Sequence, residues 1–127
     1  MIAGLARSSL VHIGVAFLAM GGWAVFANRA HPMPQPLVAG VVQGALSGAI
    51  TFVLKRMLEF LAVRFSGLAA LVLPPVIAVL LSLGILTAIH ALAATPEILA
   101  TIALPLSVTA LYSLVYTAAL WRGGKAA

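Results

Sequence analysis

The chain is 127 residues long; 64% of its residues are hydrophobic, 7% are charged, and its formal net charge is +5. Because soluble domains carry roughly 25% charged residues, this composition excludes a soluble globular fold and predicts a single transmembrane domain over residues 1–127. The absence of cysteine excludes disulfides, iron–sulfur clusters and cysteine nucleophiles, and the seven Lys and Arg residues flank apolar runs, which indicates membrane orientation and no nucleic-acid partner.

Four charge-poor stretches follow one another along the chain, at about residues 8–27, 37–54, 66–93 and 98–121. Each approaches the roughly 20 residues that a helix needs to cross a hydrocarbon core about 30 Å thick. Backbone groups in lipid must be hydrogen-bonded within the segment, and no strand-like alternation occurs, so each stretch is predicted to be a helix. The expected fold is all-α, a four-helix transmembrane bundle. The first stretch also resembles a signal peptide, but it is long for a signal and has the right length for a span.

The distribution of Lys and Arg predicts the orientation of these spans. Arg29 stands alone among the loops on one side, whereas six basic residues stand on the other side: Arg7, Lys55, Arg56, Arg64, Arg122 and Lys125. Cytoplasmic loops carry the excess of basic residues, so both termini are expected to be cytoplasmic. The chain is then a multi-pass protein of the cell inner membrane.

The segment directly after the second span, residues 55–65, has an amphipathic pattern. Helical spacing places Lys55, Arg56 and Glu59 on one side and apolar side chains on the other. This pattern predicts a helical extension that lies at the inner membrane interface, where each basic residue gains about 1 kcal/mol near anionic lipid. The alternative is that the basic residues only anchor the topology.

Gly40, Gly44 and Gly48 recur every four residues along the second span. At this spacing the glycines fall on one face of a helix and let another backbone approach closely, so tight helix packing is predicted. The partner is either another helix of the same chain, such as the glycine-containing first span, or a second copy. We expect a homo-oligomer, because four helices with this glycine ladder make a thin protein.

Pro74 and Pro75 interrupt the third span. Inside a helix these prolines would free the carbonyls of Ala70 and Leu71 and bend the axis, whereas proline is tolerated better in a first turn. Two alternatives are open at this point: a long helix that is kinked at the prolines, and a short helix that starts near Pro75.

Several hydroxyl side chains of the second and fourth spans share one depth, roughly 5–10 Å inside the inner end at a rise of about 1.5 Å per residue. These hydroxyls belong to Ser47, Thr51, Tyr112, Ser113 and Tyr116. The basic residues just below them are Lys55, Arg56 and Arg122. Hydroxyl donors and basic groups suit an anionic headgroup, so these residues form the predicted ligand site. The alternative is that Ser and Thr bond their own helix while the tyrosines form an interfacial belt.

Catalytic and metal-binding patterns are absent from the sequence. The acids Glu59 and Glu97 lie at helix ends, and no nucleophile–base pair has a recognisable spacing. His12 and His90 lie most of a membrane thickness apart and cannot share a haem. The alternative is that His31, His90 and Glu97 meet at the outer surface and bind a metal, which their residue types suit, but no ligand-spacing motif supports such a site. We therefore expect no enzymatic activity, no metal and no cofactor.

The expected function is non-enzymatic binding or transport of a lipidic or small polar ligand. Membrane lipids, anionic ones among them, are the expected partners. The alternative is an accessory or assembly subunit of a larger membrane protein complex.

Overall fold

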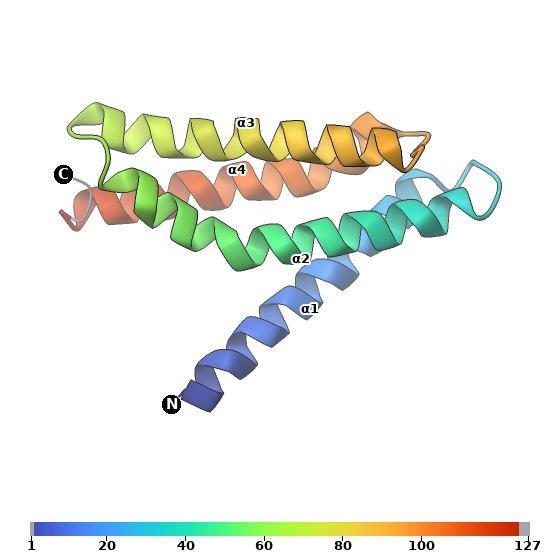
Figure 1. The fold of residues 1–127 in the computed structure, drawn as a ribbon, viewed down its shortest axis with the longest axis horizontal. Helices are drawn as coiled ribbons and strands as arrows, with labels where there is room; N and C mark the ends of the chain where they lie inside the picture. Colours follow the sequence, from blue (N-terminus) through green and yellow to red (C-terminus); the bar gives the residue numbers. More distant parts are fainter. Residues whose placement is uncertain (1, 125–127) are drawn as a thin grey trace. The chain divides into compact units, whose positions relative to one another are not determined.

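The computed structural model describes residues 2–124, with side chains from residue 10 onward, so the side chain of Arg7 and all of Lys125 lie outside the described residues. The described part contains four helices: α1 (Ile2–Ala27), α2 (Gln35–Ala62), α3 (Leu68–Leu92) and α4 (Ile98–Arg122) (Figure 1). All four are long and apolar enough to cross a membrane. The prediction of an all-helical membrane fold is confirmed at this level of length and composition.

The first two helices are longer than the expected spans, since α1 begins at Ile2 and α2 at Gln35. α2 does not end near Leu54 but continues to Ala62, so most of the amphipathic segment belongs to the same helix. α3 begins at Leu68 and runs without interruption through Pro74 and Pro75. The alternative of a short helix starting near Pro75 is therefore wrong, because the first six residues before the prolines are already helical.

The C-terminus of α3 shows how local hydrogen bonds end a helix. Ala94 adopts a left-handed conformation with φ of 57°, although such positions usually hold glycine. The backbone N–H of Thr95 donates to the carbonyl of His90 at 2.9 Å, and that of Ala94 donates to the carbonyl of Ala91 at 3.1 Å. These two bonds form a Schellman motif, which satisfies carbonyls that the helix itself leaves unpaired.

The chain divides into two compact units, each described by itself. Unit 1 comprises Met1–Phe52 and Ile85–Pro105, and unit 2 comprises Val53–Gly84 and Leu106–Ala127. α1 belongs entirely to unit 1, whereas α2, α3 and α4 contribute residues to both units.

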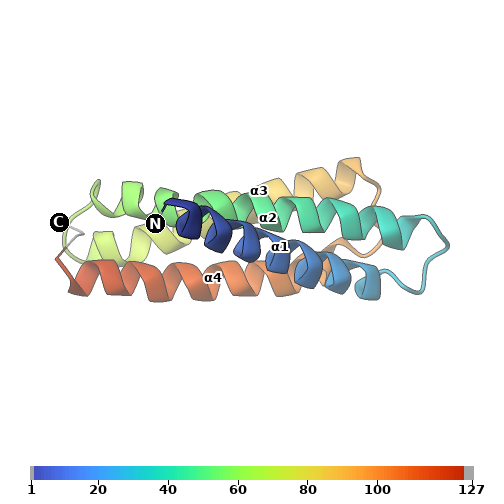
Figure 2. The same cartoon turned by 90° about the horizontal axis from the view of Figure 1, so that it is seen from below.

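Within unit 1, the second half of α1 packs closely on the first half of α2 (Figures 1 and 2). A Cβ atom built on Gly21 would lie 2.8 Å from the carbonyl oxygen of Gly40, and one built on Gly44 would lie 2.9 Å from the carbonyl oxygen of Phe17. A Cβ on Gly48 would lie 3.2 Å from a methyl group of Ile13. The three glycines of α2 thus face α1 of the same chain.

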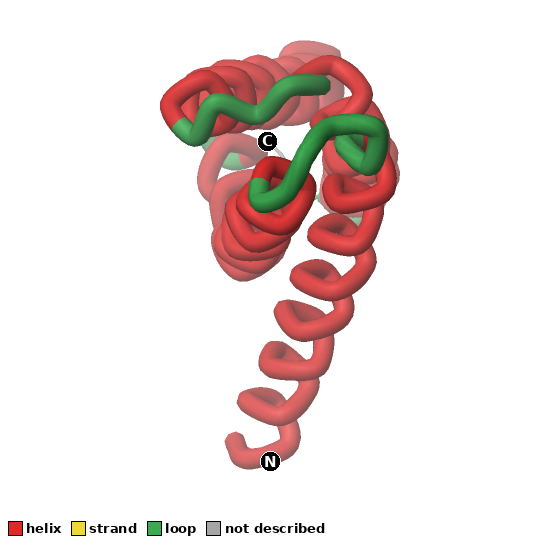
Figure 3. The backbone as a smooth tube through the Cα atoms, turned by 90° about the vertical axis from the view of Figure 1, so that its right-hand side faces the viewer, coloured by secondary structure: helices red, strands yellow, loops and turns green. Residues whose placement is uncertain are grey.

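Two loops of unit 1, residues 28–34 and 93–97, lie at the same end (Figure 3). The first follows α1 and contains Pro32 and Pro34, which disfavour continuation of the helix. The second joins α3 to α4. Their proximity allows side chains from the end of α1 to reach the start of α4.

Unit 2 has a small apolar core built from three helices. Ala62 of α2, Ala70 of α3 and Leu120 of α4 are buried together, and Phe65 and Tyr116 pack against them. Gly67, in the turn between α2 and α3, adopts a left-handed conformation with φ of 61°. Its carbonyl accepts a hydrogen bond from the indole N–H of Trp121 at 2.9 Å. This bond ties the turn to the last part of α4.

Burial in the described residues favours small and polar side chains over large apolar ones. Half of the ten buried hydrophobic residues are alanines, whereas large residues such as Leu18 and Leu92 are 74% and 88% exposed. In water such exposure would mark interaction surfaces, but on helices that fit a membrane the surrounding lipid covers it.

Candidate functional site

Six polar side chains among the described residues have no exposed surface at all. They belong to Asn28, Gln43, His90, Thr101, Ser113 and Thr117. Burying a polar group costs free energy unless the group is hydrogen-bonded. The partners of these side chains therefore separate structural polar contacts from a candidate binding site.

In unit 1, Asn28 joins the end of α1 to the start of α4. Its Nδ2 donates to the carbonyl of Ala24 at 2.8 Å and to the hydroxyl of Thr101 at 2.7 Å, and its Oδ1 accepts the backbone N–H of Glu97 at 2.9 Å. The hydroxyl of Thr101 in turn donates to the carbonyl of Glu97 at 2.6 Å. Asn28 thus caps a helix that begins 70 residues later in the chain (at Ile98) and satisfies one of its free N–H groups.

Two contacts nearer the surface reinforce this joint. His31 Nε2 lies 2.7 Å from a carboxylate oxygen of Glu97, and the indole N–H of Trp23 donates to the carbonyl of Ala100 at 2.9 Å. His31 and Glu97 are both partly exposed, so their pairing contributes little by itself.

A second set of hydrogen bonds in unit 1 runs through His90. Gln43 Oε1 carries no proton, so His90 Nε2–H donates to it at 2.8 Å, and the hydroxyl of Thr95 donates to His90 Nδ1 at 2.7 Å. Gln43 Nε2 donates to the hydroxyl of Ser47 at 2.8 Å. The four side chains form one row of hydrogen bonds in which each residue donates to the next, in the order Thr95, His90, Gln43 and Ser47. Both ring nitrogens of His90 are used, so this histidine serves the packing of α2 and α3.

Unit 2 contrasts with unit 1 in its buried polar groups. The hydroxyl oxygens of Ser113 and Thr117, four residues apart on α4, are buried and have no hydrogen-bond partner. The other four fully buried polar side chains, all in unit 1, have partners. The unsatisfied hydroxyls therefore single out this part of α4 as the candidate site.

An acidic and aromatic group flanks these hydroxyls. The hydroxyl of Tyr116 donates to a carboxylate oxygen of Glu59 in α2, and the rings of Tyr112 and Tyr116 stack with centroids 5.6 Å apart. Glu59 places a carboxylate in unit 2, although the predicted ligand site contained only hydroxyls and basic groups. This carboxylate favours a ligand that donates hydrogen bonds or carries positive charge.

The proline-containing turns of α3 supply further oxygens to unit 2. Pro74 and Pro75 are buried in an uninterrupted helix, and neither has an N–H. The carbonyls of Ala70 and Leu71, four residues earlier, consequently lack their usual helical donors. Ala70 is fully buried, so its carbonyl needs a donor from a neighbouring helix, water or a ligand, whereas Leu71 is only partly buried.

The remaining predicted site residues occupy different environments. Ser47 is buried in unit 1 and bonded to Gln43, whereas Thr51, in the same unit, is exposed. In unit 2, Tyr112 is 40% exposed. The three basic residues of the predicted site, Lys55, Arg56 and Arg122, are exposed in unit 2.

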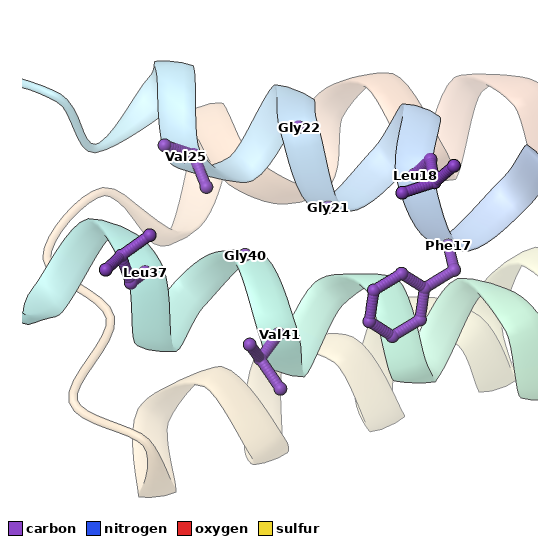
Figure 4. A pocket seen from close by; sticks show the side chains of 8 residues that line it. All are labelled: Phe17, Leu18, Gly21, Gly22, Val25, Leu37, Gly40 and Val41. Carbon is purple, nitrogen blue, oxygen red and sulfur yellow. The ribbon is translucent and has the colours of Figure 1, made fainter.

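A shallow apolar groove lies elsewhere, between α1 and α2 of unit 1 (Figure 4). It has a volume of about 240 Å³ and is lined by Phe17, Leu18, Gly21, Gly22, Val25, Leu37, Gly40 and Val41. The ring of Phe17 extends from α1 toward α2 (Figure 4). The lining side chains offer no polar group, so the groove has no chemistry of its own to orient a polar ligand.

In comparisons with known proteins, the chain matches no protein-family model, no curated protein and no solved structure.

Proposed function

We propose that the protein is a non-enzymatic membrane protein that binds or transports a small polar ligand or lipid headgroup at the α4 hydroxyls of unit 2. The observation that carries the proposal is the complete burial of Ser113 and Thr117 without hydrogen-bond partners. Leaving such a group unsatisfied costs about 1–3 kcal/mol, which a bound ligand would recover.

The competing explanation is local. A Ser or Thr side chain in a helix can rotate and bond the carbonyl four residues earlier, which would satisfy the hydroxyl without any ligand. In that case Ser113 and Thr117 would only pack helices. Removal of both hydroxyls separates the two explanations, because only a binding site loses a ligand.

We further propose that the protein lies in the cell inner membrane with both termini in the cytoplasm. The support is the excess of Lys and Arg on the side that carries Lys55 and Arg122. In this orientation the exposed basic side chains of unit 2 meet anionic headgroups, each with a gain of about 1 kcal/mol.

Native mass spectrometry of protein extracted in lipid nanodiscs tests the binding proposal. We expect the wild type to retain a defined non-protein mass that the double variant Ser113→Ala, Thr117→Val loses while remaining folded by circular dichroism. Thr87→Val removes an exposed hydroxyl from α3 and is the matched control. An identical set of bound masses in all three proteins would contradict the proposal.

A second candidate function, an accessory subunit of a larger membrane complex or a homo-oligomer, is favoured by the surface of α1. Cβ atoms built on Gly14 and Gly22 would meet nothing within 4 Å, so another helix has room to approach closely there. Since the chain has no cysteine, a Gly14→Cys variant allows clean disulfide trapping in membranes. A band of twice the monomer mass identifies a second copy, and a band of another mass identifies a different subunit.

A further inference from the structure

We infer that the buried oxygens of unit 2 bind a small monovalent cation, an inference that rests on the proposed function and names its ligand class. The oxygens are the hydroxyls of Ser113 and Thr117 on α4 and the carbonyl of the buried residue Ala70 on α3. The two hydroxyls have no hydrogen-bond partner. A carbonyl four residues before a proline lacks the N–H donor that the helix would otherwise supply.

The packing of unit 2 brings these oxygens to facing surfaces of two helices. Ala70 packs with Leu120 in the apolar core, and α3 and α4 run antiparallel (Figures 1 and 2). One turn along α3 from Ala70 leads to Pro74, and one turn back along α4 from Leu120 leads to Thr117. The carbonyl of Ala70 points along α3 toward Pro74, and therefore toward the level of Thr117.

The residues at this level are small or lack donors. Ala78, one turn beyond Pro74, and Ser113, one turn before Thr117, are both buried, so the buried faces of α3 and α4 carry small side chains here, while the fully buried Leu58 of α2 packs in the same unit. Pro74 has no N–H to offer either hydroxyl. The polar atoms on these two faces are hydroxyl and carbonyl oxygens.

The charge of the site selects the ligand. Hydroxyl and carbonyl oxygens are neutral. The carboxylate of Glu59 accepts a hydrogen bond from the hydroxyl of Tyr116, and Tyr116 packs against the core that contains Ala70. Divalent cations in proteins rely on several carboxylate ligands, which this group lacks. Proline-freed or unwound carbonyls combined with neutral side-chain oxygens are the ligands that membrane proteins use for Na⁺.

Thermal unfolding in nanodiscs at constant ionic strength tests the inference, with NaCl, KCl or N-methylglucamine chloride as the salt. A ligand that binds only the folded state raises the melting temperature as its concentration increases. We expect a rise of a few degrees with NaCl or KCl relative to N-methylglucamine chloride. The Thr87→Val control should retain this rise, and the Ser113→Ala, Thr117→Val variant should lose it.

A Pro74→Ala variant keeps the test valid if the double variant does not fold. Alanine at position 74 restores an N–H that pairs the carbonyl of Ala70 and improves the helix. We expect unchanged or higher stability in N-methylglucamine chloride, together with a smaller response to NaCl or KCl. Radioactive ²²Na⁺ binding measured on the same samples should fall in parallel.

Equal melting temperatures of the wild type in all three salts would overturn the inference. If the hydroxyl-dependent mass is still seen by native mass spectrometry, the proposed function stands with a different ligand. If neither a salt response nor a hydroxyl-dependent mass is found, both fail, and water or the helix backbone satisfies the oxygens.

Discussion

The side-chain amide of Asn28 lies 2.7 Å from the hydroxyl of Thr101, 73 residues further along the chain. Together with the bond from the backbone N–H of Glu97 to Asn28, this contact fixes the end of α1 to the first turn of α4. Both residues are fully buried, so the contact is shielded from water. Asn28 uses both its amide nitrogen and its amide oxygen in this joint.

Replacing Asn28 with alanine should lower the stability of the folded state by about 2 kcal/mol. The variant leaves the hydroxyl of Thr101 and the N–H of Glu97 with one partner fewer in a buried site. Reversible unfolding in mixed micelles measures the change. Arg29→Ala, at the neighbouring exposed position, should shift stability by less than about 0.5 kcal/mol. Equal effects of the two substitutions would mean that the joint does not hold the helices together.

Replacing Gly44 with leucine should disrupt the contact between α1 and α2. A Cβ at this position would already lie 2.9 Å from the backbone carbonyl of Phe17, so the helices must move apart. We expect loss of the folded protein or a markedly lower melting temperature. Gly14→Leu is the control, because a Cβ there meets nothing within 4 Å, and it should be tolerated by the isolated protein.

His90 and Gln43 should show strong coupling in a double-mutant cycle. Each single change to leucine strands a buried partner, whereas the double change removes both ends of the bond. We expect the double variant to be more stable than the sum of the single effects predicts, with a coupling of about 0.5–3 kcal/mol. Additive effects on the free energy of unfolding would show that the bond contributes nothing specific.

Ala94→Gly should leave stability unchanged or raise it by up to about 1 kcal/mol. A left-handed conformation costs an alanine about 1–2 kcal/mol, and glycine avoids this cost while losing part of the gain through the entropy of the unfolded chain. Ala93→Gly changes the preceding residue, whose N–H is bonded to the carbonyl of Ile89 at 2.9 Å, and should only destabilise. Thermal melts of the two variants side by side give the comparison.

Reporter fusions test the proposed orientation. A fusion at the C-terminus should report the cytoplasm, and a fusion at Met33, in the loop after α1, should report the opposite side. Substituted-cysteine labelling at the same positions gives an independent measurement. An exported C-terminal reporter would reverse the orientation proposed for the whole chain.

Hydropathy alone predicts the four helices, because length and apolar composition decide whether a segment can cross a membrane. The continuity of α3 through Pro74 and Pro75 could not be predicted, since it depends on neighbours that stabilise a helix with missing hydrogen bonds. Depth in the membrane places Ser113 among the candidate site residues but gives no information on which way a side chain faces. Ser47 and Thr51 lie one turn apart on α2, yet Ser47 is buried and bonded to Gln43, whereas Thr51 is exposed.

Two polar contacts between helices could not be predicted from sequence patterns. Gln43 and His90 are 47 residues apart, and nothing in their local sequence marks them as partners. Glu59 was expected beside Lys55 and Arg56 at the membrane interface, and its bond with the hydroxyl of Tyr116 in unit 2 was not predicted. Such pairs depend on how the helices are rotated about their axes, which a hydropathy profile does not contain.

The burial pattern of alanines and polar groups inside and leucines outside has a calorimetric consequence. The heat capacity of unfolding grows with the apolar surface that becomes newly exposed and falls with the polar surface. Here the large apolar side chains are already exposed in the folded chain, and many of the groups released on unfolding are hydroxyls, amides and methyls of alanine. In micelles the stability of this protein should therefore fall almost linearly with temperature, without the curvature that produces cold denaturation in soluble domains of similar length.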